Sequence, residues 1–125
     1  MTTPKRILVV EDDESIRAVL DMALSDEGYE VIEAENGAQG LALARTTQPH
    51  VILLDMRMPV MDGWAVARAL RGQGITVPII VMTAAESARR WADEVGAEGY
   101  LAKPFGLDEL LATVERFRGS EGRAN

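Results

Sequence analysis

Residues 51–59, which read VILLDMRMP, decide the fold of this chain and point to its site. Four consecutive apolar residues without polar alternation predict a parallel strand that is buried on both faces. Asp55 follows them directly, and Pro59 lies in the segment that breaks the strand. The pattern therefore predicts a lone carboxylate at the end of a buried strand.

Residues 7–13, which read ILVVEDD, repeat this design. Here an apolar run leads into Glu11, Asp12 and Asp13. In a sheet with helices on both faces, two such strands would bring three or four carboxylates to one edge. Like charges at that distance raise one another's pKa and cost free energy unless a cation lies among them. The sequence therefore predicts a divalent metal beside a carboxylate that performs chemistry.

The composition limits the classes of function. A chain of 125 residues has room for one domain, and its 47% hydrophobic and 26% charged residues are typical of a globular protein. The net charge of -7 argues against nonspecific binding to nucleic acid or anionic lipid. The absence of cysteine excludes disulfides and thiolate metal sites. No leading apolar segment is long enough for a signal peptide or a membrane span, so we expect a cytoplasmic protein without membrane contact.

Apolar runs alternate with helical patterns along the chain. We predict strands at residues 7–10, 29–34, 51–54, 77–82 and 99–102. We predict helices at residues 16–24, 38–45, 62–72, 87–95 and 107–117, with Asn36 as an N-cap. This alternation implies an α/β fold with a parallel sheet and right-handed crossovers, in which ligands bind at the carboxyl ends of strands. The polar residues expected at those ends are Glu11, Asp12, Asp55, Thr83 and Lys103.

Four motifs in this order make the chain resemble a receiver domain of the bacterial two-component response regulators. They are ILVVED at residues 7–12, LDMRMPVMDG at 54–63, MTA at 82–84 and GYLAKPF at 99–105. The resemblance covers residues 5–118 and extends to the single-domain chemotaxis regulator. It implies a doubly wound, flavodoxin-like fold: a five-stranded parallel sheet in the order 2-1-3-4-5, flanked by five helices. We expect a receiver domain at residues 1–118 and a frayed or disordered tail at 119–125.

The resemblance also implies a chemistry for the acidic residues. Asp55 would accept a phosphoryl group from the phosphohistidine of a histidine kinase or phosphotransfer protein. Mg²⁺ would be held by Asp12, Asp55 and the backbone carbonyl of Arg57, with Glu11 acting through a metal-bound water. A physical reason stands beside the resemblance, because a carboxylate can attack phosphorus only if a cation offsets both negative charges. Hard carboxylate oxygens are the ligands that Mg²⁺ prefers.

Two further residues would read the phosphate. By the resemblance, Lys103 brings an ammonium group to the phosphoryl oxygens and Thr83 brings a hydroxyl, while Pro104 forms a cis peptide with Lys103. Phosphorylation would draw Thr83 toward the phosphate, and Tyr100 would turn inward behind it. The signal would then reach a surface of the fourth helix, fifth strand and fifth helix, where a downstream protein or a second copy of the chain binds. We expect this surface to include Trp91, Tyr100 and Arg116.

Two other functions compete with a phosphorylatable switch that catalyses only its own phosphorylation and dephosphorylation. An aspartyl-phosphate phosphohydrolase typically has a second acid two residues after its nucleophile, where this chain has Arg57. A nucleotide-binding domain would need a glycine-rich turn after the first strand, where residues 11–14 are all acidic and would repel a pyrophosphate. We therefore predict a signalling module rather than an enzyme that acts on outside substrates.

Some points stay open in the sequence. In the family, the positions of Arg57 and Ala85 flank the water that attacks the acyl phosphate, and Arg57 could either block or orient it. Asp13 fits a first-turn helix residue or a support for the metal site, and Trp64 is interpreted as amphipathic helix surface. No effector region follows residue 118, which favours action by protein contact alone over a receiver cut from a longer protein. The kinase, the partner and the output are not specified.

Overall fold

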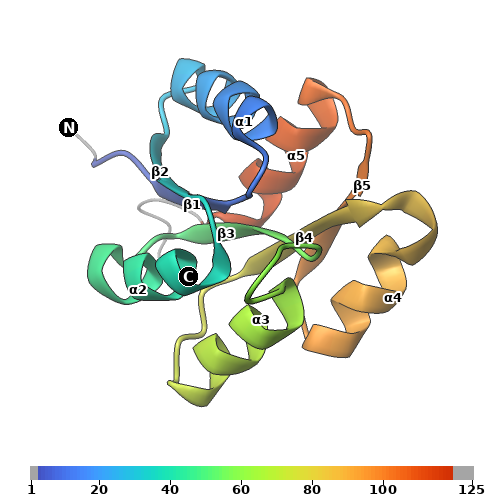
Figure 1. Cartoon of the computed structure of the whole chain (residues 1–125). Helices are drawn as coiled ribbons and strands as arrows, with labels where there is room; N and C mark the ends of the chain where they lie inside the picture. Colours follow the sequence, from blue (N-terminus) through green and yellow to red (C-terminus); the bar gives the residue numbers. More distant parts are fainter. Residues whose placement is uncertain (1–2, 120–125) are drawn as a thin grey trace.

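The computed structural model describes residues 3–119, which form one parallel sheet between two layers of helices (Figure 1). The strand order is β2-β1-β3-β4-β5, as predicted. The strands are β1 (Arg6–Val10), β2 (Glu30–Ala34), β3 (Val51–Asp55), β4 (Ile79–Ala84) and β5 (Gly99–Lys103). The helices are α1 (Glu14–Asp26), α2 (Gly37–Thr47), α3 (Gly63–Gly72), α4 (Ala85–Val95) and α5 (Leu107–Phe117). Apart from Gly119, the tail predicted at residues 119–125 lies outside the described residues.

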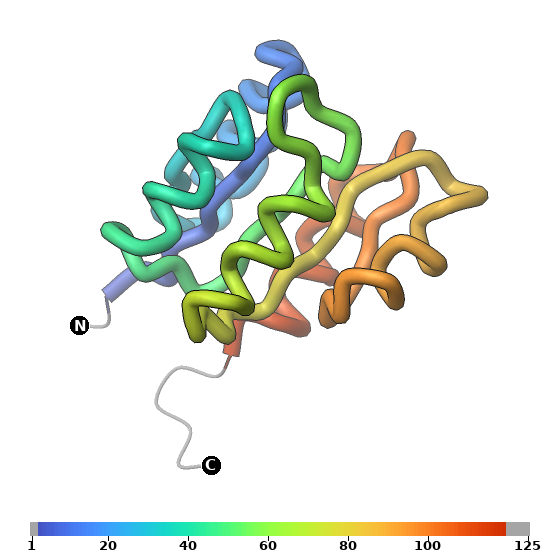
Figure 2. The backbone as a smooth tube through the Cα atoms, turned by 60° about the horizontal axis from the view of Figure 1, so that its bottom comes forward, coloured from blue at the N-terminus to red at the C-terminus, as the bar shows by residue number. Residues whose placement is uncertain are grey.

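The helices divide between the two faces of the sheet. Helices α1 and α5 cover one face, and α2, α3 and α4 cover the other (Figure 1). Figure 2 shows α2 and α3 side by side on the same face of the sheet. All strand pairs are parallel, so the carboxyl ends of β1, β3, β4 and β5 lie along one edge. At that edge Asp55 pairs with Met82, and Ala84 pairs with Lys103.

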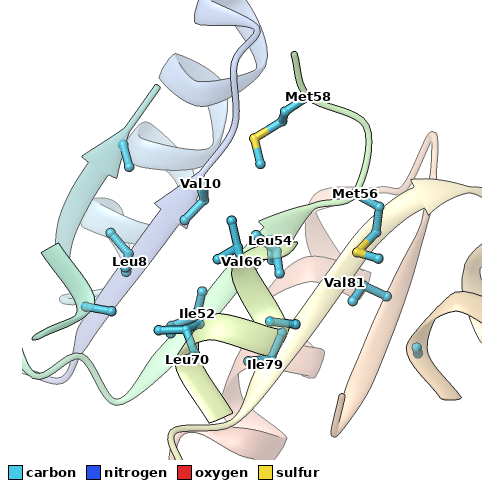
Figure 3. Close-up of a cluster of buried hydrophobic side chains, with 14 residues drawn as sticks. Leu8, Val10, Ile52, Leu54, Met56, Met58, Val66, Leu70, Ile79 and Val81 are labelled. Carbon is cyan, nitrogen blue, oxygen red and sulfur yellow. The ribbon is translucent and has the colours of Figure 1, made fainter. Parts of the chain in front are cut away.

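The central strand β3 explains the unbroken apolar run, because all five of its residues are buried. Ile52 and Leu54 point into the cluster beneath α2, α3 and α4, together with Leu8, Val66 and others (Figure 3). Val51 and Leu53 point to the opposite face and pack with residues of α1 and α5. A strand covered on both sides has no polar face, so it shows no alternation in the sequence.

The fourth strand is the main difference from the sequence prediction, because it covers Ile79–Ala84 rather than residues 77–82. The guanidinium of Arg71 accounts for the later start. Its Nη1 donates to the carbonyl oxygen of Val77 at 2.9 Å, and Pro78 has no N–H to offer the sheet. At its other end the strand continues to Ala84, because Thr83 and Ala84 pair with Ala102 and Lys103 of β5.

Side-chain caps set the starts of three helices. Asn36 accepts a hydrogen bond from the backbone N–H of Gln39, which confirms it as the N-cap of α2. Asp62 caps α3, and Asp13 caps α1 by accepting from the backbone N–H of Ile16 at 3.0 Å. A helix-capping role is therefore shown for Asp13. Helix α4 differs, since it starts two residues earlier than predicted and its N-cap makes no side-chain hydrogen bond.

We predict opposite effects for alanine at the two ends of α3. A Cβ at Gly63 would lie 2.7 Å from Met56 Cα and 2.9 Å from the Asp55 carbonyl oxygen, so the backbone beside the site would have to move. Gly63→Ala should lower the free energy of unfolding by about 1–3 kcal/mol in urea denaturation. Gly72→Ala is the matched control, because nothing lies within 4 Å of its Cβ, and it should raise stability by up to about 1 kcal/mol. Equal effects of the two substitutions would contradict this reading of the packing.

Candidate functional site

Three carboxylates gather at the carboxyl edge of the sheet. Glu11 and Asp12 follow β1, Asp55 ends β3, and one oxygen of each lies within 4.8 Å of the others. Glu11 and Asp55 are 1% and 4% exposed, whereas Asp12 is exposed. Two apolar runs that each end in carboxylates predicted this cluster, and the structure confirms it.

One ammonium group faces these charges. Lys103 Nζ lies 3.1 Å from Glu11 Oε1 and 3.5 Å from Asp55 Oδ1. The other Glu11 oxygen, Oε2, accepts from the backbone N–H of Asp13 at 3.1 Å. Both oxygens of Glu11 therefore already have protein partners. This leaves Asp12 and Asp55 as the carboxylates better able to contact an ion directly.

Asp55 is buried but weakly neutralised. Its Oδ1 accepts from the backbone N–H of Arg57 at 3.2 Å and faces Lys103. Burial raises the pKa of Asp55 to about 7, and the negative charge of Glu11 adds to this effect while Lys103 opposes it. Without a further cation, the pocket therefore disfavours the ionised form of Asp55.

The donor set fits a hard divalent cation. The carboxylates open into a pocket of about 500 Å³ that Asp12, Asp55, Arg57, Thr83 and Lys103 help to line. Three carboxylates against one nearby ammonium leave an excess of negative charge, and their oxygens suit Mg²⁺, which completes its octahedron with water. The backbone carbonyl of Arg57 as a further ligand stays a prediction.

Thr83 and Lys103 reach the same pocket from neighbouring strands. Thr83 is 3% exposed near the end of β4, where it pairs with Ala102, and Lys103 ends β5. The peptide between Lys103 and Pro104 is cis, as predicted. Tyr100, on the same strand as Lys103, is 44% exposed and thus faces outward in this structure.

A stack of Arg57, Trp91 and Trp64 joins the pocket to α4 and α3, and no sequence pattern predicts it. The guanidinium carbon of Arg57 lies 5.5 Å from the ring centroid of Trp91. That ring meets Trp64 of α3 edge-on, with centroids 4.6 Å apart, and Trp64 Nε1 donates to Glu94 Oε1 at 3.0 Å. Trp64 is therefore more than helix surface. These residues lie far apart in the sequence, and no local spacing connects them.

The residues predicted for the partner surface lie in two places, and the surface itself stays a prediction. Tyr100 and Arg116 line one groove between α4, β5 and α5, together with Arg89 and Phe117. Trp91 does not line that groove. Its ring is turned toward α3 and the acidic pocket, because it packs on Trp64 and Arg57.

The sequence matches the response regulator receiver domain over residues 7–115. The chain belongs to this family. Response regulator MprA of Mycobacterium sp. (strain KMS) is 46% identical over 113 residues, covering 89% of this chain and 49% of that protein. Transcriptional regulatory protein PrrA of Mycobacterium bovis is 44% identical over 123 residues, covering 94% of this chain and 53% of that protein. This receiver chain thus spans about half the length of the curated relatives it matches.

Solved receiver domains have the same fold. Chemotaxis response regulator CheY4 of Vibrio cholerae is 38% identical, with a TM-score of 0.84 that covers 92% of this chain and 99% of that one. The receiver domain of sensor histidine kinase PA1611 from Pseudomonas aeruginosa is 35% identical, with a TM-score of 0.85 over 94% of this chain and 100% of that one. That structure has a magnesium ion coordinated in its active site cleft. Within residues 3–119, the receiver has no helix that is both long and apolar enough to cross a bilayer.

We predict a pH dependence of stability that belongs to Asp55. Because its pKa rises from 3.8 to about 7 on folding, the folded state holds this proton more tightly. The resulting stabilisation is complete below pH 3.8 and is lost as the pH rises through about 7. In EDTA at pH 8, Asp55→Asn should therefore be more stable than the wild type, by on the order of 3 kcal/mol. At pH 4 the two proteins should be nearly equal.

Urea denaturation at both pH values measures this difference. Asp26→Asn, an exposed acid at the end of α1, should leave the pH dependence of the wild type unchanged. Millimolar Mg²⁺ should raise the stability of the wild type at pH 8 more than that of Asp55→Asn. If the difference in unfolding free energy between the wild type and Asp55→Asn in EDTA were the same at pH 4 and pH 8, the raised pKa of Asp55 would be contradicted.

Proposed function

We propose that this receiver domain accepts a phosphoryl group on Asp55 from the phosphohistidine of a histidine kinase or phosphotransfer protein. One observation carries the proposal: a buried carboxylate at a strand end whose Oδ1 accepts from the N–H of Arg57 and faces the ammonium of Lys103. These two contacts orient the carboxylate in a pocket that an incoming phosphoryl group can enter.

The transfer is a single displacement at phosphorus. A carboxylate oxygen of Asp55 donates an electron pair to phosphorus, the P–N bond to the histidine breaks, and its electrons stay on the imidazole nitrogen, which takes up a proton from water. The products are an acyl phosphate and a neutral histidine. Lys103 neutralises charge on the phosphoryl oxygens, and the Thr83 hydroxyl donates a hydrogen bond to one of them.

We propose Mg²⁺ as the cofactor of this site. Asp12, Asp55 and the carbonyl oxygen of Arg57 would hold it, with Glu11 acting through a water molecule because both of its oxygens already have protein partners. The ion supplies positive charge that lets an anionic nucleophile meet an anionic phosphoryl group. It also lowers the cost of ionising Asp55 at neutral pH, since an opposite charge at this distance lowers the pKa of a carboxyl.

A phosphohydrolase that acts on an outside substrate is not favoured. Such an enzyme needs an acid two residues after the nucleophile to protonate the leaving group, and Arg57 cannot donate a proton at neutral pH. The domain then catalyses only its own phosphorylation and dephosphorylation.

The signal leaves the site through Thr83 and Tyr100. Tyr100 is 44% exposed on β5, three residues before Lys103, so a turn of its ring inward would change the groove that it lines with Arg116. We propose that this groove between α4, β5 and α5 binds a downstream protein or a second copy of the chain.

We propose residues 1–118 as the receiver unit, which acts in the cytoplasm. The expectation that it makes no direct contact with nucleic acid rests on the net charge of -7 and stays a prediction. It concerns this chain alone, which matches about half of Transcriptional regulatory protein PrrA.

Phosphorylation can be tested with the purified chain, acetyl phosphate and Mg²⁺. Intact-mass spectrometry should show the gain of one phosphoryl group, which Asp55→Asn and EDTA each abolish. Asp13→Asn is the matched control, because Asp13 caps α1 rather than holding the ion, and it should still be labelled. Equal labelling of Asp55→Asn and the wild type would disprove the assignment.

The output surface can be mapped by NMR. Adding fluoroberyllate with Mg²⁺, which mimics the phosphoryl group, should shift backbone resonances around the pocket and on α4, β5 and α5. Thr83→Ala should reduce the shifts on β5 and α5 while leaving those of residues 11–13, because it removes the hydroxyl that transmits the change. Distant shifts that cluster on α1 and α2 instead would contradict this surface.

A further inference from the structure

Two cationic side chains line the acidic pocket within the described part of the chain, and they are held very differently. Lys103 is engaged by Glu11 and Asp55 at 3.1 and 3.5 Å. Arg57 is exposed, and its guanidinium has no carboxylate partner among the described residues; it lies 5.5 Å from the ring centroid of Trp91. Arg57 is therefore the cation that is able to move.

We propose that the Arg57 guanidinium is a second cationic ligand of the phosphoryl group, and that Trp91 is the positioning residue that holds it beside the pocket until phosphorylation. The proposal rests on the phosphorylation of Asp55 proposed above. When the dianion forms, the guanidinium leaves the ring of Trp91 for the phosphoryl oxygens, and the link between the pocket and α4 is broken.

The relative strengths of the two contacts decide the direction of this movement. A cation–π contact at an exposed site changes an equilibrium by roughly two- to fivefold. A charge-assisted hydrogen bond of a guanidinium to a phosphate, which is often bidentate, is worth roughly tenfold to a hundredfold. Before phosphorylation, a dication held by Asp12 and Asp55 would repel the guanidinium and so favour its contact with the ring. After phosphorylation the dianion attracts it more strongly than the ring does.

Two features of helix α4 make it sensitive to the loss of the contact between Arg57 and Trp91. Its N-cap residue, Ala84, makes no side-chain hydrogen bond, and its fully buried residues are the small Ala88 and Ala92. Trp91 of α4 contacts α3 by packing edge-on against Trp64. Losing Arg57 therefore changes the environment of the largest side chain that ties α4 to its neighbour. Because α4 also borders the groove of Tyr100 and Arg116, this is a second route from the phosphate to that surface.

Tryptophan fluorescence tests the movement directly. The chain has two tryptophans, so Trp64→Phe leaves Trp91 as the single emitter. In that background, fluoroberyllate added to the Mg²⁺-loaded protein should change the emission of Trp91, because a cation leaves its ring. Arg57→Gln should abolish the change. Arg68→Gln, which removes an exposed arginine of α3, is the charge-matched control and should preserve it.

The binding of fluoroberyllate gives a second readout in the otherwise wild-type chain. Trp91→Leu should tighten it about two- to fivefold, because the guanidinium no longer has to leave a ring. In the Arg57→Gln background, Trp91→Leu should leave the affinity for fluoroberyllate unchanged. If Trp91 had a purely structural role, its substitution would change the affinity equally in both backgrounds. Intact-mass labelling with acetyl phosphate is measured on every variant. Labelling of Asp55 without a change in Trp91 emission would overturn this inference and leave the proposed function standing, whereas no labelling of the wild type would overturn the proposed function.

Discussion

The rest of the site depends on the crowding of carboxylates at one edge of the sheet. Glu11 and Asp55 are almost completely buried, and Asp12 lies beside them at the surface. A single ammonium, that of Lys103, faces this group at 3.1 and 3.5 Å. Burial and the negative charge of Glu11 raise the pKa of Asp55 to about 7. The described residues therefore neutralise the carboxylate of Asp55 incompletely. A bound cation or phosphoryl group would strongly change the free energy of its ionised form.

The fold makes this crowding unavoidable. Parallel strands send all their carboxyl ends to one edge, so groups that end β1, β3, β4 and β5 meet there whatever their separation in the chain. The strands themselves are held by apolar layers on both faces, one of which Figure 3 shows, and β3 is buried along its whole length. The free energy of folding thus comes from residues away from the pocket, and this lets the edge keep an unfavourable arrangement of charge.

The alternation of strands and helices and the acidic cluster could be predicted from the sequence because each depends on a local pattern, whereas the strand order followed from the family resemblance. An apolar run that ends in a carboxylate can be read from a few consecutive residues, and so can the cap formed by Asn36. The later start of β4 could not be predicted in this way, because it depends on the contact of the Arg71 side chain with the carbonyl of Val77. The contact between Trp64 and Trp91 could not be predicted for the same reason, because it depends on how α3 and α4 pack on the same face of the sheet.

Burial limits which groups can carry a signal out of the pocket. Glu11, Asp55 and Thr83 are each at most 4% exposed, so large movements of these side chains would disturb the packed edge of the sheet. The groups that are free to rearrange lie at its rim. Tyr100 is partly exposed on β5, and Arg57 is exposed beside the ring of Trp91. Both adjoin α4 or the strand that follows it, while α1 and α2 present no comparable cation to the pocket among the described residues. On the proposed function, a dianion at Asp55 would therefore act most strongly on the side of the molecule that carries α4 and β5, because Arg57 and Tyr100 both lie there.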